Sequence, residues 1–161
     1  MKKSRSKSIQ RDVAPFSAAD GVVDYCVSDP KSKTLRPGMT PSKLIQALRG
    51  GLPIQELELL QARLGVPMET LFPLLGISKA TYHRRKASGK LGADESDRVV
   101  RFARLMGKAV EVFGSAENAR KWLTSPQIGL GGAIPLAYAD TEVGAREIED
   151  LLGRIEYGVY S

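Results

Sequence analysis

The sequence predicts an all-α protein, and three observations support this fold class. Beyond residue 40, apolar residues recur at the three- and four-residue spacing of amphipathic helices. The segments with this spacing begin at residues that cap helices and end at glycine or proline, as helix boundaries commonly do. No segment alternates apolar and polar side chains convincingly over the length of a strand. We therefore expect a chain built from helices.

Two helices are predicted at the start of the helical part. Thr40 is a favourable N-cap, and Pro41 follows at the helical position that tolerates proline. Before Gly50 ends this helix, one face carries Leu44, Ile45 and Leu48. The second helix runs from Pro53 to Gly65, which suits the C-cap. Its apolar stripe consists of Ile54, Leu57, Leu60 and Leu64.

A helix-turn-helix is predicted over residues 68–88. The first helix covers residues 68–75, and Gly76 stands where the turn needs a left-handed backbone. Ser78 can cap the second helix, which is polar and basic over residues 79–86. This order of an apolar helix, a glycine turn and a basic helix is the pattern of a DNA-binding motif.

Two positions depart from the usual pattern of this motif. Pro73 interrupts the first helix, and a start near Thr70 would place the proline in the first turn, where it costs little. Arg85 occupies the position of a third apolar anchor, and we expect its stem to pack while its guanidinium stays in water.

Further helices are predicted after residue 93. The strongest amphipathic stripe belongs to a long helix capped by Asp94 or a neighbour. This stripe consists of Val99, Phe102, Ala103, Met106, Val110 and Phe113. Ser115 caps residues 116–123, and a glycine-rich loop leads to residues 134–138. Thr141 caps the last helix, whose predicted buried face consists of Val143, Ile148, Leu151, Leu152 and Ile155.

Charge divides the chain of 161 residues unevenly. Residues 1–40 carry eight basic and four acidic side chains, residues 41–106 carry eleven and six, and residues 107–161 carry five and eight. A basic front and an acidic back predict two surfaces for two kinds of partner. Residues 1–40 lack a sustained apolar period, so we interpret them as a flexible basic arm. A solvated leader is the favoured role for this arm, and a DNA-contacting tail is the alternative.

The second helix of the motif carries the candidate DNA-binding residues, because its donors suit phosphates and guanine edges. Residues at its N-terminal end are expected to contact bases, and these are Ser78, Lys79, Thr81 and Tyr82. His83 belongs to the same candidate surface. The cations expected to contact the DNA backbone are Arg84, Arg85, Lys86 and Lys90. A helical hairpin with a solvated basic face is the alternative interpretation.

The sequence predicts no catalytic site, metal site or cofactor. Cys26 is the only cysteine, which excludes a multi-cysteine metal site and favours a reducing compartment. His83 is the only histidine and lies among cations. A nucleophilic pair of these two residues is disfavoured, since Cys26 falls in the arm. No apolar run is long enough to span a membrane, so we expect a cytoplasmic protein. The sequence lacks an arrangement of acid, base and metal-ligand residues for catalysis, so we also expect that the protein is not an enzyme.

A family resemblance covers the chain from Leu75 to the C-terminus. The residues that carry it are Gly76-Ile77-Ser78, Tyr82 to Lys86, Glu95 to Arg98, Val112-Phe113-Gly114, Ala119 to Leu123, Pro126, Leu130-Gly131-Gly132, Pro135-Leu136, Thr141, Gly144 and Leu151 to Tyr160. In these residues the sequence resembles the Xre/MbcA/ParS antitoxins, which pair with RES-domain toxins. By this resemblance, residues 41–105 form an Xre-like helix-turn-helix domain that binds DNA and dimerises. Residues 106–161 then form a small helical toxin-binding domain.

The resemblance also implies a mechanism. RES-domain toxins consume NAD, and the antitoxin neutralises them by covering the entrance to their active site. The complex represses its own operon by binding operator DNA, with a homodimer supplying two half-sites. The expected toxin-binding residues are Arg154, Glu156, Tyr157, Val159, Tyr160 and Ser161. The alternative is a stand-alone transcriptional regulator whose C-terminal domain dimerises or binds another protein.

Overall fold

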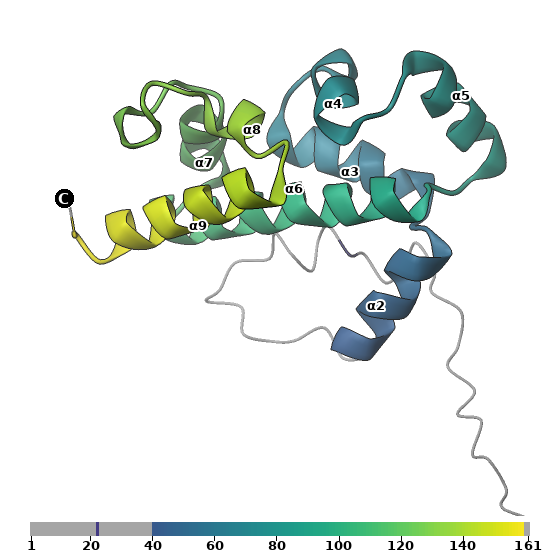
Figure 1. Ribbon diagram of the computed structural model, residues 1–161, viewed down its shortest axis with the longest axis horizontal. Helices are drawn as coiled ribbons and strands as arrows, with labels where there is room; N and C mark the ends of the chain where they lie inside the picture. Colours follow the sequence, from purple (N-terminus) through teal and green to yellow (C-terminus); the bar gives the residue numbers. More distant parts are fainter. Residues whose placement is uncertain (1–21, 23–39, 160–161) are drawn as a thin grey trace, which may run out of the picture.

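The computed structural model describes Val22 and residues 40–159 (Figure 1). In this part of the chain the regular elements are helices, and one isolated β-bridge pairs Pro53 with Lys90. The all-α prediction is confirmed. The elements are α2 (Pro41–Gly50), α3 (Ile54–Leu64), α4 (Met68–Leu75), α5 (Lys79–Ser88), α6 (Ala93–Phe113), α7 (Ala116–Leu123), the 3₁₀ helix η2 (Ile128–Leu130), α8 (Pro135–Tyr138) and α9 (Glu142–Glu156).

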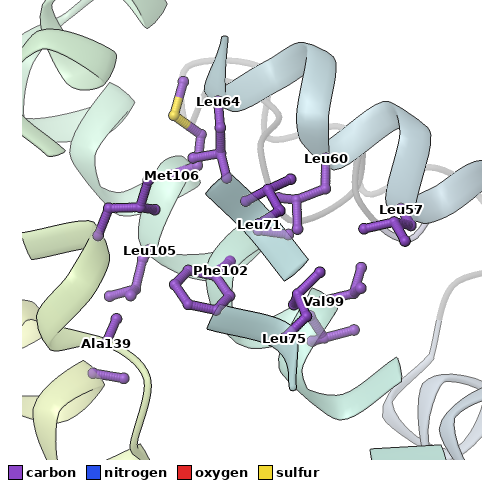
Figure 2. Packing of buried hydrophobic residues seen from close by; sticks show 14 of the residues in the cluster. Leu57, Leu60, Leu64, Leu71, Leu75, Val99, Phe102, Leu105, Met106 and Ala139 are labelled. Atoms are coloured by element: carbon purple, nitrogen blue, oxygen red, sulfur yellow. The ribbon is translucent and has the colours of Figure 1, made fainter. Parts of the chain in front are cut away.

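The long helix α6 is the axis of the fold. Helices α2, α3, α4, α7 and α9 pack against it, and α9 lies alongside it (Figure 1). The predicted stripe of α6 is buried at Val99, Phe102, Ala103 and Met106. Val110 and Phe113 are half-buried and pack against the core. Figure 2 shows Phe102 among the leucines of α3 and α4. The apolar stripe of α6 therefore supplies the common packing surface.

A single hydrophobic core runs through the described part of the chain. It extends from Leu57 of α3 through Phe102 and Met106 of α6 to Leu152 of α9. The predicted division between residues 105 and 106 falls inside α6, which continues from Ala93 to Phe113. Both parts of the chain thus share one helix, which fixes their relative position.

Predicted N-caps are present at four helices. Thr40, Ser78, Ser115 and Thr141 each accept a hydrogen bond from the backbone N–H three residues later, at 3.0 to 3.2 Å. Helix α6 differs, because its N-cap is Gly92 and Asp94 lies inside the first turn. A side chain still closes this end, since Glu95 accepts a hydrogen bond from the Gly92 N–H at 2.6 Å.

Helix α4 starts earlier than expected. It begins at Met68 after an extended Pro67, not near Thr70, so Pro73 lies inside the helix and outside its first turn. Proline has no N–H to donate to the carbonyl of Glu69, four residues earlier. Both residues are exposed, so water can take the place of the missing donor. The surface position of this helix face allows the proline.

The expected buried face of α9 is wrong at Val143. This side chain is 76% exposed, whereas Ala145, Ile148 and Leu152 are buried. Leu151 and Ile155 are half-buried at the edge of this stripe. The buried residues follow three- and four-residue spacing, and Val143 lies five residues before Ile148, well off their face.

Of the predicted basic arm, residues 1–40, the structure describes Val22 and the N-cap Thr40. The Val22 side chain is fully buried, and its backbone N–H donates a hydrogen bond to the Glu56 carboxylate of α3 at 3.0 Å. At this position the structure contradicts the expectation of a flexible arm. Residues 1–21 and 23–39 of the arm lie outside the described part of the chain.

Helices α8 and α9 approach each other closely at Gly144 of α9, and substitutions can test this contact. A Cβ atom at Gly144 would overlap the Tyr138 carbonyl oxygen, whereas one at Gly153 would meet no atom within 4 Å. We expect Gly144→Ala to lower the free energy of unfolding by about 1–3 kcal/mol through steric strain. In contrast, Gly153→Ala should raise the free energy of unfolding by up to about 1 kcal/mol, because alanine has the higher helix propensity. Urea denaturation followed by circular dichroism measures both, and equal effects would contradict the close contact.

Candidate functional site

The turn between α4 and α5 has the geometry of a helix-turn-helix. Gly76 adopts a left-handed conformation, with φ of 63° and ψ of 32°. The N–H of the buried Ile77 donates to the Phe72 carbonyl at 2.9 Å. Arg98 of α6 donates to the Leu75 carbonyl at 2.8 Å. The turn is therefore held both by its own backbone and by α6, which sets the direction of α5.

Helix α5 lies on the surface and contains no buried residue. Lys79, Arg84 and Lys90 are exposed, and within the described residues they make no ion pair. The ring of His83 lies 5.7 Å from that of Tyr82. Ser78 and Thr81 are joined by the cap, in which the Ser78 hydroxyl also donates to the Thr81 hydroxyl at 2.9 Å. Except for Lys90, which follows two residues after the helix, the predicted DNA-binding residues thus lie on α5 or at its N-cap.

Arg85 differs from its neighbours because its guanidinium is already paired. Its Nε and Nη2 donate to both carboxylate oxygens of Glu95, at 2.9 to 3.2 Å. The same carboxylate closes the start of α6 at Gly92. Contrary to the expectation of a guanidinium free in water, Arg85 joins α5 to α6. A bidentate pair of this kind also fixes orientation.

Tyr82 and Lys86 form a second link, this time to α3. The Tyr82 ring packs on Phe72 with a centroid distance of 5.4 Å, and its hydroxyl donates to Glu58 at 3.4 Å. Lys86 Nζ lies 3.2 Å from the same carboxylate. The hydrogen bond to Glu58 raises the pKa of Lys86 above its ordinary value. Glu58 was not predicted from the sequence, since 28 residues separate it from Lys86 and only folding brings them together.

The C-terminal end of α9 presents a second exposed surface. Tyr157 is 79% exposed and Val159 is 55% exposed. Two grooves, of about 590 and 470 Å³, share Arg154 and Val159 in their walls. Tyr160 and Ser161 lie outside the described residues. Four of the six predicted toxin-binding residues can therefore be placed, and they lie together at this end of the molecule.

Much of the acidic surface of α9 is neutralised within the chain. Arg101 lies 3.1 Å from Glu142, Arg104 lies 2.6 Å from Glu149, and Lys108 lies 2.7 Å from Glu156. Because the residue numbers rise together in these pairs, α6 and α9 run parallel. We call the three pairs the α6–α9 ladder. Glu156 was predicted to face the toxin, but in this structure it belongs to the ladder.

Two pKa shifts follow from the ladder. The hydrogen bond to Glu156 raises the pKa of Lys108. Burial alone would raise the pKa of Glu142, but the hydrogen bond from Arg146 and the charges of Arg101 and Arg104 lower it below its ordinary value. Both shifts favour the charged forms that make the ion pairs.

Ile128 is an exposed residue that the sequence did not single out. Its side chain is 98% exposed in η2, beside the larger of the two grooves.

Among the described residues, no group of three or more histidine, cysteine, aspartate or glutamate side chains could hold a metal ion. Over the same residues, no helix is long and apolar enough to cross a membrane.

These features define a class of protein. A helix-turn-helix and a small helical domain share the helix α6, and exposed surfaces lie at α5 and at the end of α9. Residues 43–104 match the antitoxin Xre-like helix-turn-helix domain. Residues 108–158 match the antitoxin Xre/MbcA/ParS C-terminal toxin-binding domain. The protein is therefore a non-enzymatic regulator that combines a helix-turn-helix domain with a toxin-binding domain.

Curated relatives identify the particular family. The chain is 36% identical over 127 residues to an antitoxin Xre of Photorhabdus laumondii, and 32% identical over 127 residues to one of Yersinia enterocolitica. Each alignment covers 78% of this chain and 86% of the relative. An antitoxin Xre of Pseudomonas putida is 37% identical over 68 residues, 42% of this chain and 43% of that relative. The chain belongs to the Xre antitoxin family.

The link between Arg85 and Glu95 yields a stability prediction. Glu95→Ala removes the partner of a half-buried guanidinium and the side-chain cap of α6, so we expect a loss of about 1–3 kcal/mol in the free energy of unfolding. Asp94→Ala is the matched control, because Asp94 is exposed in the same turn and has no side-chain partner among the described residues. Chemical denaturation compares the two variants. Equal losses would contradict a structural role for the Arg85–Glu95 pair.

Proposed function

We propose that this antitoxin neutralises a RES-domain, NAD-consuming toxin and represses its own operon by binding operator DNA. In this proposal, residues 41–105 bind DNA and dimerise, and residues 106–161 cover the entrance to the toxin's active site. The observation that carries the proposal is the placement of two unlike exposed surfaces on one helical axis. One surface is the basic helix α5, and the other is the apolar and aromatic end of α9. Both partners would be met in the cytoplasm.

The DNA-binding part of the proposal rests on α5. Gly76 sets the direction of α5. Lys79, Arg84 and the nearby Lys90 make no ion pair with any residue that the structure describes. Such cations neutralise phosphates and release counterions, which gives affinity without sequence selectivity. Exposed polar groups at the N-terminal end of a recognition helix can contact base edges. We assign Ser78, Lys79 and Thr81 to bases, and Arg84 and Lys90 to phosphates.

The structure changes the roles we assign to the other predicted residues of α5. Arg85 and Lys86 hold the helix in place through Glu95 and Glu58, so we assign them a positioning role. Tyr82 packs on Phe72 and supports the same orientation. Two such helices, one from each subunit of a homodimer, would meet successive half-sites on one face of the operator.

Arg84 is expected to bind the phosphate backbone of DNA. We expect Arg84→Ala to weaken binding to the operator and to an unrelated duplex alike, and to reduce the slope of log affinity against log salt by about 1. Lys121→Ala is the control, because it removes the same charge from an exposed position on α7. Fluorescence anisotropy at several salt concentrations gives both quantities. An Arg84→Ala variant with unchanged affinity and slope would refute the assignment.

The C-terminal residues after α9 are expected to contribute to toxin binding. The full chain is expected to co-purify with a toxin encoded by the adjacent gene when the two are co-expressed, and a chain that ends at Glu156 should bind this toxin at least about tenfold more weakly. The truncated chain should still bind operator DNA with unchanged affinity, since α5 is untouched. Absence of a complex with the full chain would favour a stand-alone transcriptional regulator instead.

A further inference from the structure

The loop that carries Ile128 is held in one shape by hydrogen bonds. The Gln127 N–H donates to the Ala133 carbonyl at 3.0 Å, and the Gly132 N–H donates back to the Gln127 carbonyl at 2.9 Å. The Gln127 side chain donates to the carbonyls of Trp122 and Ser125, each at 3.0 Å. These bonds tie η2 to the end of α7. An exposed side chain on this loop is therefore presented in a defined position.

A glycine brings this loop against α9. A Cβ atom at Gly129 would lie 2.8 Å from a methyl carbon of Leu151, so only glycine lets the backbone approach this closely without a shift. The preceding residue, Ile128, remains 98% exposed. The loop packs on α9 through Gly129 and leaves its isoleucine in water.

The groove beside Ile128 is mainly apolar. We call it the Ile128 groove, and its walls include Pro126, Ile128, Leu151, Arg154, Ile155 and Val159. Single exposed apolar residues are common on protein surfaces, but here a rigidly held isoleucine borders an apolar groove. Arg154 stands in its wall, and its guanidinium makes no ion pair with any described residue. An apolar groove with one unpaired cation is complementary to an apolar element that carries a carboxylate.

We propose that Ile128 is an anchor residue of the toxin interface, and that the Ile128 groove receives an apolar element of the toxin with a carboxylate opposite Arg154. This inference rests on the proposed function and extends the interface from the C-terminal residues to the η2 loop. Apart from Val159, the residues that line the groove belong to residues 108–158, which match the toxin-binding domain. Leu151, Arg154 and Ile155 of the groove walls belong to the C-terminal half of α9, and Figure 1 shows the C-terminal end of α9 at the opposite end of the molecule from α5. A toxin seated there leaves the basic helix free.

The test measures affinity for the toxin encoded by the adjacent gene, purified as a catalytically inactive variant, by isothermal titration calorimetry. Ile128→Ser is expected to weaken binding at least about tenfold, as loss of an interface anchor does. Ile128→Val keeps most of the apolar surface and should stay within about threefold of the wild-type chain. Val143→Ser is the matched control, because Val143 is 76% exposed on α9 but does not line the groove.

Thermal unfolding and two Arg154 variants show whether a loss of affinity reflects a lost contact with the toxin or a loss of stability. Thermal unfolding of Ile128→Ser should match that of the wild-type chain, since the side chain makes little contact within it. Arg154→Glu should weaken binding more than Arg154→Ala, through repulsion of the toxin's carboxylate. If the wild-type chain binds and Ile128→Ser binds equally well, the anchor role is overturned while the proposed function stands. If the wild-type chain does not bind, the proposed function fails and this inference fails with it.

Discussion

Burial of the apolar stripe of α6 is the interaction on which the rest of the structure depends. Phe102, Ala103 and Met106 are fully buried, and neighbouring helices take their positions by covering them. At 21 residues, α6 is about 30 Å long at the usual rise per residue. It therefore separates α5 from the end of α9 and holds them in a fixed relation. Neither half could keep its core without the part of α6 that it covers.

Polar contacts then fix the register between neighbouring elements, because apolar packing alone would let them slide along each other. The buried Ser96 of α6 accepts from the Leu52 N–H at 2.8 Å and donates to the Gly92 carbonyl at 2.7 Å, which fastens the loop before α3. The α6–α9 ladder does the same for two parallel helices. Its side chains are partly exposed, so each pair contributes little free energy. The consequence is geometric, because a shift of α9 by one turn would separate all three pairs.

Features of the fold that depend on local sequence were predictable, and those that depend on contacts between distant residues were not. The caps at Thr40, Ser78, Ser115 and Thr141 follow from a side chain and a backbone N–H three residues apart. The exposure of Val143 was predictable as well, since this residue lies five positions before Ile148 and off the three- and four-residue spacing of the buried face. The partners of the site were not predictable, because they lie on other helices. Glu58 and Glu95 engage Lys86 and Arg85 across helices, and no spacing in the sequence indicates it.

These pairs change what the basic charge of the helix-turn-helix can do. By composition, α5 and Lys90 offer five cations, but Arg85 and Lys86 already have carboxylate partners in the free protein. A phosphate that recruited the half-buried Arg85 would first have to displace the Glu95 carboxylate, so the net gain would be smaller than that from an unpaired cation. The Lys86–Glu58 pair is more exposed, and displacing its carboxylate costs less. Lys79, Arg84 and Lys90 carry no such cost within the described residues. Since Lys79 is assigned to a base, the salt dependence of DNA binding should report about two phosphate contacts for each α5, those of Arg84 and Lys90, and not five. The paired cations contribute differently, because they keep α5 in one orientation, and a recognition helix needs a fixed orientation before its base contacts can select a sequence.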